Sequence, residues 1–369
     1  MLKTLLNSSL LFASCLLLQV NMANAAEVSK LDESLVPVDS RSAAERKQAI
    51  SVGLKSVILK NSGSKSTLAH PSIAAMVKQP TALISQFGYQ ELDGELYLQV
   101  SFDHKRVIRL LREAKQPVWG KQRPLTLVWV VEELPGERVI VNDGSLLESR
   151  SLFQVESEAK GVPLLFPLMD LDDNMKVSAN DIRGMFAEQV DGASQRYQAD
   201  YFVMASIDTT ASPLKYNLAL YPVGKGEPMH TPLVSKRDVV GDINAAVTEI
   251  ISTVSEYYVG RYAIADTGAE IASYVDFIDI TDMKQLVSIE KYLKQLSAVK
   301  SVQLTQLNGT RARYTLELFG TEEDLHRLMN LEPRVHPQER LDIDPFNRVQ
   351  GSDPFTSEES VGIEYRWQG

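Results

Sequence analysis

The sequence of 369 residues predicts an α/β fold: a mainly parallel sheet flanked by helices, with a smaller ferredoxin-like unit near the C-terminus. Two observations carry this prediction. Short, nearly continuous apolar runs at 125–131, 162–168 and 201–205 are separated by helical patterns, and strands buried on both faces have this composition. Alternating strands and helices favour parallel pairing with right-handed crossovers. Residues 273–332 show the order β-α-β-β-α, which is most of a split βαβ motif.

Residues 26–115 predict an N-terminal α+β region. A capping box that starts at Ser42 begins a helix, and Gly63 ends it. Apolar residues then alternate over 95–103, which predicts a strand with one buried face. A basic helix at 104–112 follows, and its charged side is expected to face solvent.

Residues 116–265 predict the α/β domain that contains the three apolar runs. Helices are expected near 145–160 and 178–198, between successive strands. Two further strands, at 216–221 and 233–236, are expected to extend one edge of the sheet. A long amphipathic helix closes the domain.

Residues 270–345 predict the ferredoxin-like unit. A strand at 274–280 and a helix lead to an Asn-Gly hairpin turn at 308–309. A second helix starts at Thr321, and a closing strand is expected at 340–344.

The N-terminal segment 1–25 has the layout of a secretory signal peptide. It carries one charge, Lys3, an apolar run, and a small-residue cleavage tripeptide that ends at Ala25. We therefore expect a periplasmic protein, and since Cys15 is the only cysteine, the processed chain needs no disulfide. A lipoprotein modified at Cys15 is the alternative. No later segment has the roughly 20 apolar residues of a membrane span, so no integral membrane insertion is expected.

Charge and motifs narrow the classes of function. The net charge of −10 disfavours nucleic acid as a partner. The five histidines are scattered, and we find no phosphate-binding glycine loop, dinucleotide fingerprint or nucleophile elbow. We therefore expect no cofactor and assign no catalytic residue.

The segment 170–181 is the sharpest candidate for a site. Oxygen-bearing side chains at Asp170, Asp172, Asn174 and Asp181 have the spacing of a calcium-binding loop. However, Met175 stands where that loop needs glycine, and Asp181 replaces the usual glutamate. The other interpretation is a strand-to-helix connection whose acidic residues cap the next helix.

The same loop supports a second hypothesis. Asp170, Asp172 and Asp173 follow a predicted parallel strand, and open α/β sheets bind ligands at the carboxyl ends of their strands. Paired carboxylates there could serve a hydrolase that acts on cell-wall or glycan material.

The last residues, 346–369, are rich in Pro, Asp, Glu and Ser and predict a mobile tail. Phe346, Phe355 and Trp367 are candidate anchors for a partner. The alternating pattern at 360–367 also fits a last edge strand.

Several stretches together resemble one family of exported Gram-negative proteins, domain of unknown function 2066. They are the signal peptide, the helix over 42–63, the Pro-Leu-Met-Asp-Leu-Asp-Asp run within 161–173, and 193–200. The resemblance covers most of residues 35–330. It implies a periplasmic protein and brings no activity, cofactor or catalytic residue.

These observations favour a non-enzymatic protein-interaction or assembly factor of the cell envelope over a hydrolase. A protein partner in the envelope is expected, and the oligomeric state is left open.

Overall fold

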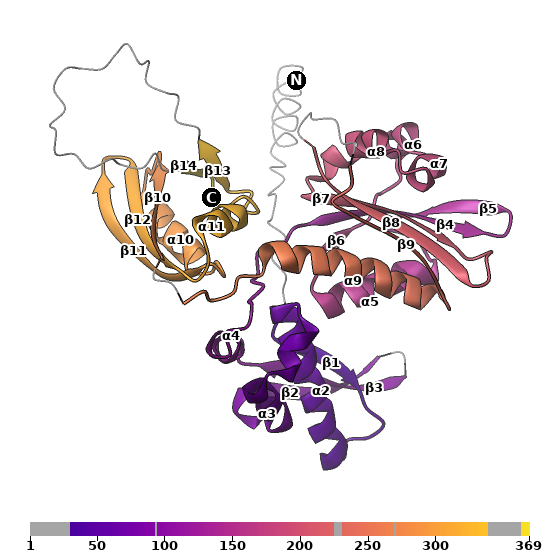
Figure 1. The fold of residues 1–369 in the computed structure, drawn as a ribbon, viewed down its shortest axis with the longest axis horizontal. Helices are drawn as coiled ribbons and strands as arrows, with labels where there is room; N and C mark the ends of the chain where they lie inside the picture. Colours follow the sequence, from indigo (N-terminus) through magenta and orange to yellow (C-terminus); the bar gives the residue numbers. More distant parts are fainter. Residues whose placement is uncertain (1–29, 93, 225–230, 269–270, 339–362) are drawn as a thin grey trace, which may run out of the picture.

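The computed structural model describes residues 30–92, 94–224, 231–268, 271–338 and 363–369. Three sheets, one in each third of the chain, form three lobes that meet around one long helix (Figure 1). Within the described ranges, no helix combines the length and apolar character needed to cross a bilayer. The predicted signal peptide lies outside these ranges.

The N-terminal lobe is a small α+β unit whose sheet has the strand order β1-β3-β2, with both pairs antiparallel. Ser42 caps the long helix as predicted, accepting a hydrogen bond from the Glu45 N–H. The Glu45 carboxylate reaches Ser40 instead of completing the box. Gly63 ends the helix with a left-handed φ of 68°. The elements are β1 (Glu33–Pro37), α2 (Ala43–Ser62), η1 (Lys65–Ala69), α3 (Pro71–Lys78), η2 (Pro80–Leu83), β2 (Ile84–Leu92), β3 (Glu95–Phe102) and α4 (His104–Glu113).

The middle lobe contains a mixed sheet with the order β5-β4-β7-β8-β9, and β6 pairs with β4. Only β4–β6 and β4–β7 are parallel, while the other three pairs are antiparallel. The prediction of a mainly parallel sheet is therefore wrong. Consecutive strands joined by short connections pair antiparallel, as β4 and β5 and also β7 and β8 do, and β9 adds a third antiparallel pair beside β8. The strands are β4 (Thr126–Leu134), β5 (Glu137–Val141), β6 (Leu164–Leu165), β7 (Tyr201–Asp208), β8 (Leu214–Pro222) and β9 (Val234–Val240).

Helices cover both faces of the middle sheet (Figure 1), which explains the continuous apolar runs. Along β4, Val128 and Val130 enter the core beneath the long helix, and Trp129 enters the core on the opposite face. One face is covered by α5 (Glu148–Lys160) and α9 (Ile243–Tyr262), and the other by α6 (Leu171–Lys176), α7 (Ala179–Arg183), α8 (Ala187–Ser194) and η3 (Gln195–Tyr197).

The C-terminal lobe has the predicted β-α-β-β-α order followed by two short strands. Its sheet has the order β11-β12-β10-β14-β13. The hairpin turn that joins β11 to β12 lies at 309–310, one residue beyond the predicted 308–309, because Asn308 still pairs with Arg311. Thr321 forms a capping box with Asp324. The elements are β10 (Ile271–Ile278), α10 (Met283–Leu293), β11 (Val299–Asn308), β12 (Arg311–Leu318), α11 (Glu322–Met329), β13 (Val335–Gln338) and β14 (Glu364–Trp367).

The chain end differs from the predicted mobile tail. Residues 364–367 form β14 inside the sheet, between β10 and β13, rather than an edge strand. The strand of this lobe that follows α11 lies at 335–338, and the predicted closing strand at 340–344 lies outside the described residues.

Two arginines join the lobes: Arg123, which is buried, and Arg112, which is half-buried. Arg123 donates to the carbonyl oxygens of Lys60 and Gly161, and thereby links α2 to the end of α5. Arg112, at the end of α4, donates to the carbonyls of Ile264 and Ser297. The prediction that the charged side of this helix faces solvent is therefore wrong for Arg112, which links the N-terminal lobe to the C-terminal lobe.

Candidate functional site

The acidic loop forms the start of α6. Asp170 is the N-cap residue, and its carboxylate accepts a hydrogen bond of 3.1 Å from the Asp173 N–H. Met169, just before it, has a left-handed φ of 54°, which turns the chain sharply out of the strand region. Of the two interpretations of this segment, a calcium-binding loop and a strand-to-helix connection, the structure shows the second.

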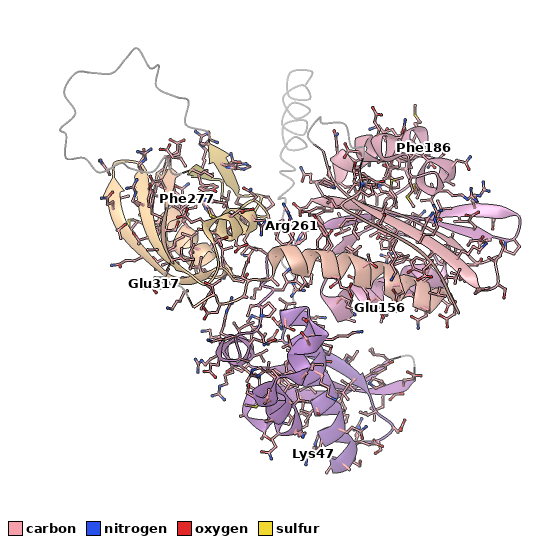
Figure 2. The ribbon with its side chains drawn as sticks, viewed as in Figure 1. Lys47, Glu156, Phe186, Arg261, Phe277 and Glu317 are labelled. Atoms are coloured by element: carbon pink, nitrogen blue, oxygen red, sulfur yellow. The ribbon has the colours of Figure 1, made fainter. Side chains whose placement is uncertain are left out.

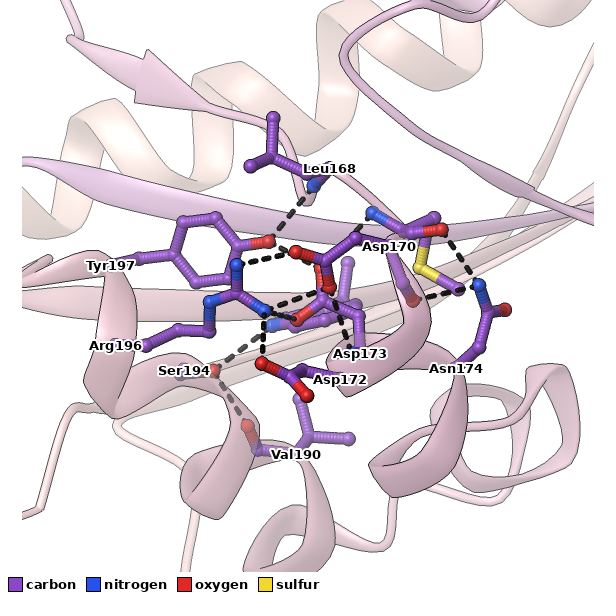
Figure 3. Close-up of polar contacts among 11 residues, drawn as sticks. Leu168, Asp170, Asp172, Asp173, Asn174, Val190, Ser194, Arg196 and Tyr197 are labelled. Atoms are coloured by element: carbon purple, nitrogen blue, oxygen red, sulfur yellow. Dashed lines mark hydrogen bonds and ion pairs between the residues drawn. The ribbon is translucent and has the colours of Figure 1, made fainter.

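Arg196 gathers the carboxylates of this loop (Figure 3). Its guanidinium binds Asp170 in bidentate fashion, at 2.8 Å and 2.6 Å, and contacts Asp173 at 3.2 Å. Asp172 lies farther away, at 3.9 Å, and its side chain is 76% exposed. Paired arginine–carboxylate contacts of this kind are among the stronger hydrogen bonds in proteins, so Arg196 neutralises two of the three candidate residues.

Asp173 is fully buried, and its second oxygen is also satisfied. It accepts a hydrogen bond of 3.0 Å from the Met169 N–H and another from the Tyr197 hydroxyl. The same hydroxyl accepts from the Leu168 N–H at 2.8 Å. A buried carboxylate needs such partners because its desolvation is costly.

The electrostatics of the loop favour fixed charges over proton transfer. The Arg196 hydrogen bond lowers the pKa of Asp170 to about 2. Burial, followed by the bond to Asp173, raises the pKa of Tyr197 to about 12. A glycosidase requires one carboxyl whose pKa is raised so that it can donate a proton. The geometry therefore fits a structural ion-pair cluster better than a catalytic pair.

The calcium candidates do not converge on one point. The Asn174 side-chain amide donates to the carbonyls of Met169 and Asp170, and Asp181 forms a capping box with Ser178 at the start of α7. Because two short helices replace the expected loop, Asp170 caps α6 while Asp181 belongs to the capping box of α7. Within the described part of the chain, no group of three acidic, histidine or cysteine side chains is arranged to hold a metal ion.

Trp367 does not serve as an exposed anchor. It is 5% exposed and packs against Phe277 and Tyr292. Side chains alternate between the two faces of a strand, so every second residue of β14 lies on the core face. The sequence analysis predicted this segment to be part of a mobile tail. Phe346 and Phe355 lie outside the described residues.

A surface that the sequence analysis missed lies around the acidic loop. Four large apolar side chains on this face are between 55% and 78% exposed: Leu171 and Met175 on α6, Leu168 in the loop before α6, and Phe186 at the start of α8. We call them the α6–α8 apolar surface. Leu171 and Met175 are one turn apart on the same side of α6. Phe186 is the N-cap residue of α8 and is labelled in Figure 2. The apolar residues at 168, 171 and 175 could have indicated this surface from the sequence. The prediction for this segment was based on its acidic residues alone.

Asp200 is a further carboxylate that sequence reasoning did not single out. It lies just before β7 and accepts a hydrogen bond of 2.7 Å from the Leu125 N–H, and its own N–H donates to the Leu125 carbonyl at 2.9 Å. Burial raises its pKa to about 6. The pair of bonds aligns the starts of β4 and β7.

A polar cleft of about 370 Å³ lies between β1, β3 and α5. Its polar groups already pair with one another. Gln99 binds the Glu33 carboxylate at 3.1 Å, the Lys60 ammonium binds the Glu33 carbonyl at 3.0 Å, and Gln154 binds Glu158 at 2.8 Å. The cleft therefore does not define a ligand class.

A comparison with family models supports membership of one family. Residues 271–339 match the model of the DUF2066 family. The predicted family is thereby confirmed, although the match lies on the C-terminal lobe rather than on the stretches around 42–63 and 161–200. Residues 25–120 match a second model, a domain of unknown function, DUF8605.

No curated protein matches the chain. Among solved structures, it is similar at 9% identity to a formyltetrahydrofolate deformylase from Pseudomonas putida KT2440. The similarity covers 55% of this chain and 91% of that one, with a TM-score of 0.17. A score this low bears on neither fold nor function.

Proposed function

We propose that this protein is a non-enzymatic interaction or assembly factor of the cell envelope, and that the α6–α8 apolar surface is where its partner docks. The observation that carries the proposal is the exposure of four large apolar side chains on α6, in the loop before it and at the start of α8. Contiguous apolar surface on a soluble domain costs solubility and commonly marks an interaction site.

The charges beside the surface define the partner. The exposed carboxylate of Asp172 adjoins Leu171, while Arg196 pairs with Asp170, and the whole chain carries a net charge of −10. An amphipathic segment with an apolar face and basic residues at its margin complements this combination. An anionic lipid surface does not, because it would be repelled.

The hydrolase alternative has less support from the geometry. Asp170 and Asp173 are held by Arg196, and the pKa of Asp170 lies far below that of a general acid. A hydrolase would lose activity in Asp170→Ala or Asp172→Ala variants that still fold. An unchanged rate of hydrolysis of cell-wall or glycan material in both variants would exclude this loop as the active site.

We further interpret the C-terminal lobe as a ferredoxin-like fold with one added strand. The order β-α-β-β-α-β and the antiparallel relation of β10 and β13 through β14 support this interpretation. The proposed location is the periplasm, on the basis of the signal peptide layout at 1–25. Fractionation by osmotic shock, with a periplasmic and a cytoplasmic marker, tests the location.

In-cell crosslinking tests the docking surface. The tagged full chain is compared with a Leu171→Glu/Met175→Glu variant and with Val155→Glu as the matched control. Val155 is an apolar side chain of similar exposure on α5, across the sheet. We expect one dominant partner that is captured by the wild type and the control and lost in the double variant. Equal capture by all three would contradict the proposal.

A further inference from the structure

The last strand occupies an unusual position in the C-terminal lobe. β14 consists of four residues, runs parallel to β10 and antiparallel to β13, and so fills an interior place in the sheet (Figure 1). The chain reaches this place only after the 24 residues at 339–362. That length of chain can span at most roughly 80 Å.

The aromatic side chains of β14 fill a prepared groove. Tyr365 is buried, and its hydroxyl is 2.6 Å from the Nδ1 of His326 on α11. Trp367 lies against Phe277 of β10 and Tyr292 of α10. The groove is therefore built from residues of 271–338, and 363–369 supply only the occupant.

The charged residues of β14 fix its register. Glu364 pairs with Arg311, and Arg366 binds Asp279 at 2.8 Å. Beyond the strand, the Gln368 N–H donates to the Arg334 carbonyl at 2.9 Å. An empty groove would expose two unpaired strand edges and an aromatic wall, which favours filling by any chain that offers the same residues.

We propose that β14 is an exchangeable strand, and that the groove between β10 and β13 accepts residues 363–369 of a second copy of this chain as well as its own. An exchanged strand makes the same contacts as the original, so the dimer loses none of them. The connection at 339–362 supplies the chain length that reciprocal exchange requires. The proposal is independent of the α6–α8 apolar surface.

Single cysteines test the exchange in a Cys15→Ser background. His336 of β13 lies directly opposite Arg366 of β14. Such Cα atoms are about 4.5–5.5 Å apart, within the range that a disulfide bridges. His336→Cys and Arg366→Cys chains with tags of different size are mixed at high concentration and oxidised. Only a strand donated between chains forms the mixed disulfide in that register.

Two controls make the result decisive. Gln303→Cys and Thr315→Cys, also directly paired, lie in the β11–β12 hairpin, which is outside the strand proposed to exchange. The double variant His336→Cys/Arg366→Cys in one chain shows that the disulfide can form. A synthetic peptide of residues 363–369 competes for the groove, and the same peptide with Tyr365→Ser and Trp367→Ser does not.

The expected result is a mixed disulfide dimer well above the hairpin pair, which the native peptide suppresses. Absence of the mixed dimer, while the double variant closes its own disulfide, would overturn the proposal. A mixed dimer that is insensitive to the peptide would overturn it as well, because collision rather than exchange would then explain the crosslink.

Discussion

The segment around α6 and the strand β14 place similar residues in opposite environments. Around α6, Leu171 and Met175 are exposed while the carboxylate of Asp173 is buried. In β14, Trp367 is buried while the charged Arg366 lies at the surface. Apolar groups inside and charges outside are the ordinary arrangement of a folded protein, and β14 follows it. The α6 segment reverses this arrangement, and exposed apolar surfaces of this kind commonly mark interaction sites.

The difference also shows how each charge is handled. Asp173 is buried because Arg196 and Tyr197 satisfy it, which leaves the adjoining apolar side chains free to face outward. The β14 charges make ion pairs with partly exposed partners, which contribute little to stability. The aromatic side chains therefore dominate the stability of β14, and the polar cluster dominates that of α6.

The largest effect is expected at Trp367. Trp367→Ala removes a buried indole from between Phe277 and Tyr292 and should lower the free energy of unfolding of the C-terminal lobe by about 3–5 kcal/mol. Met175→Ala is the matched change on the exposed side and should stay within about 0.5 kcal/mol. Urea unfolding of both variants measures the contrast. Equal effects would remove the distinction between the two regions.

A smaller loss is expected at Arg196. Arg196→Met leaves the Asp173 carboxylate buried without its cation and should cost about 2–4 kcal/mol, less than a fully buried pair because Arg196 is 31% exposed. Asp172→Asn, at the exposed end of the same cluster, is the control and should be near neutral. Thermal unfolding at pH 7 compares the two. A neutral Arg196→Met would show that the cluster does not hold α6.

Asp200 should give a pH-dependent gain. Its folded-state pKa of about 6 exceeds the ordinary value of 3.8, so its stabilising protonated form is lost as pH rises through 6. Asp200→Asn should therefore raise the free energy of unfolding by about 1–2 kcal/mol at pH 7.5 and change little below pH 4. Asp208→Asn should show the opposite sign, because a Thr210 hydrogen bond lowers the pKa of Asp208. A gain at Asp200 that is independent of pH would contradict this account.

The smallest effect is expected from calcium. Because Arg196 occupies Asp170 and Asp173, a cation would have to displace the guanidinium. Melting temperatures with calcium and with a chelator should therefore agree. A rise with calcium that disappears in Asp170→Asn would restore the calcium interpretation of the loop.

Local signals predicted much of the fold. The N-cap at Ser42, the hairpin turn beside Gly309 and the capping box at Thr321 are short-range features that the chain forms by itself, although the turn lies one residue beyond its predicted place. Strand direction was not predictable in this way, since apolar runs report burial on both faces and not the sense of pairing. The place of β14 depends on a contact made across the 24 residues at 339–362.

The sequence predicted where the acidic loop lies but not that its carboxylates form an ion-pair cluster with an arginine. Asp170 stood out by its spacing, whereas its partner Arg196 is 26 residues away and meets it only because η3 folds back over α6. Without that contact the carboxylates were read as free, and the exposure of Leu171 and Met175 was not predicted.

The most direct test of the central claim is the in-cell capture by the wild type, Leu171→Glu/Met175→Glu and Val155→Glu. If the α6–α8 apolar surface is the docking site, one partner is recovered with the wild type and with Val155→Glu and disappears with the double variant, while all three chains keep the same melting temperature. Recovery of the same partner by the folded double variant would contradict the claim.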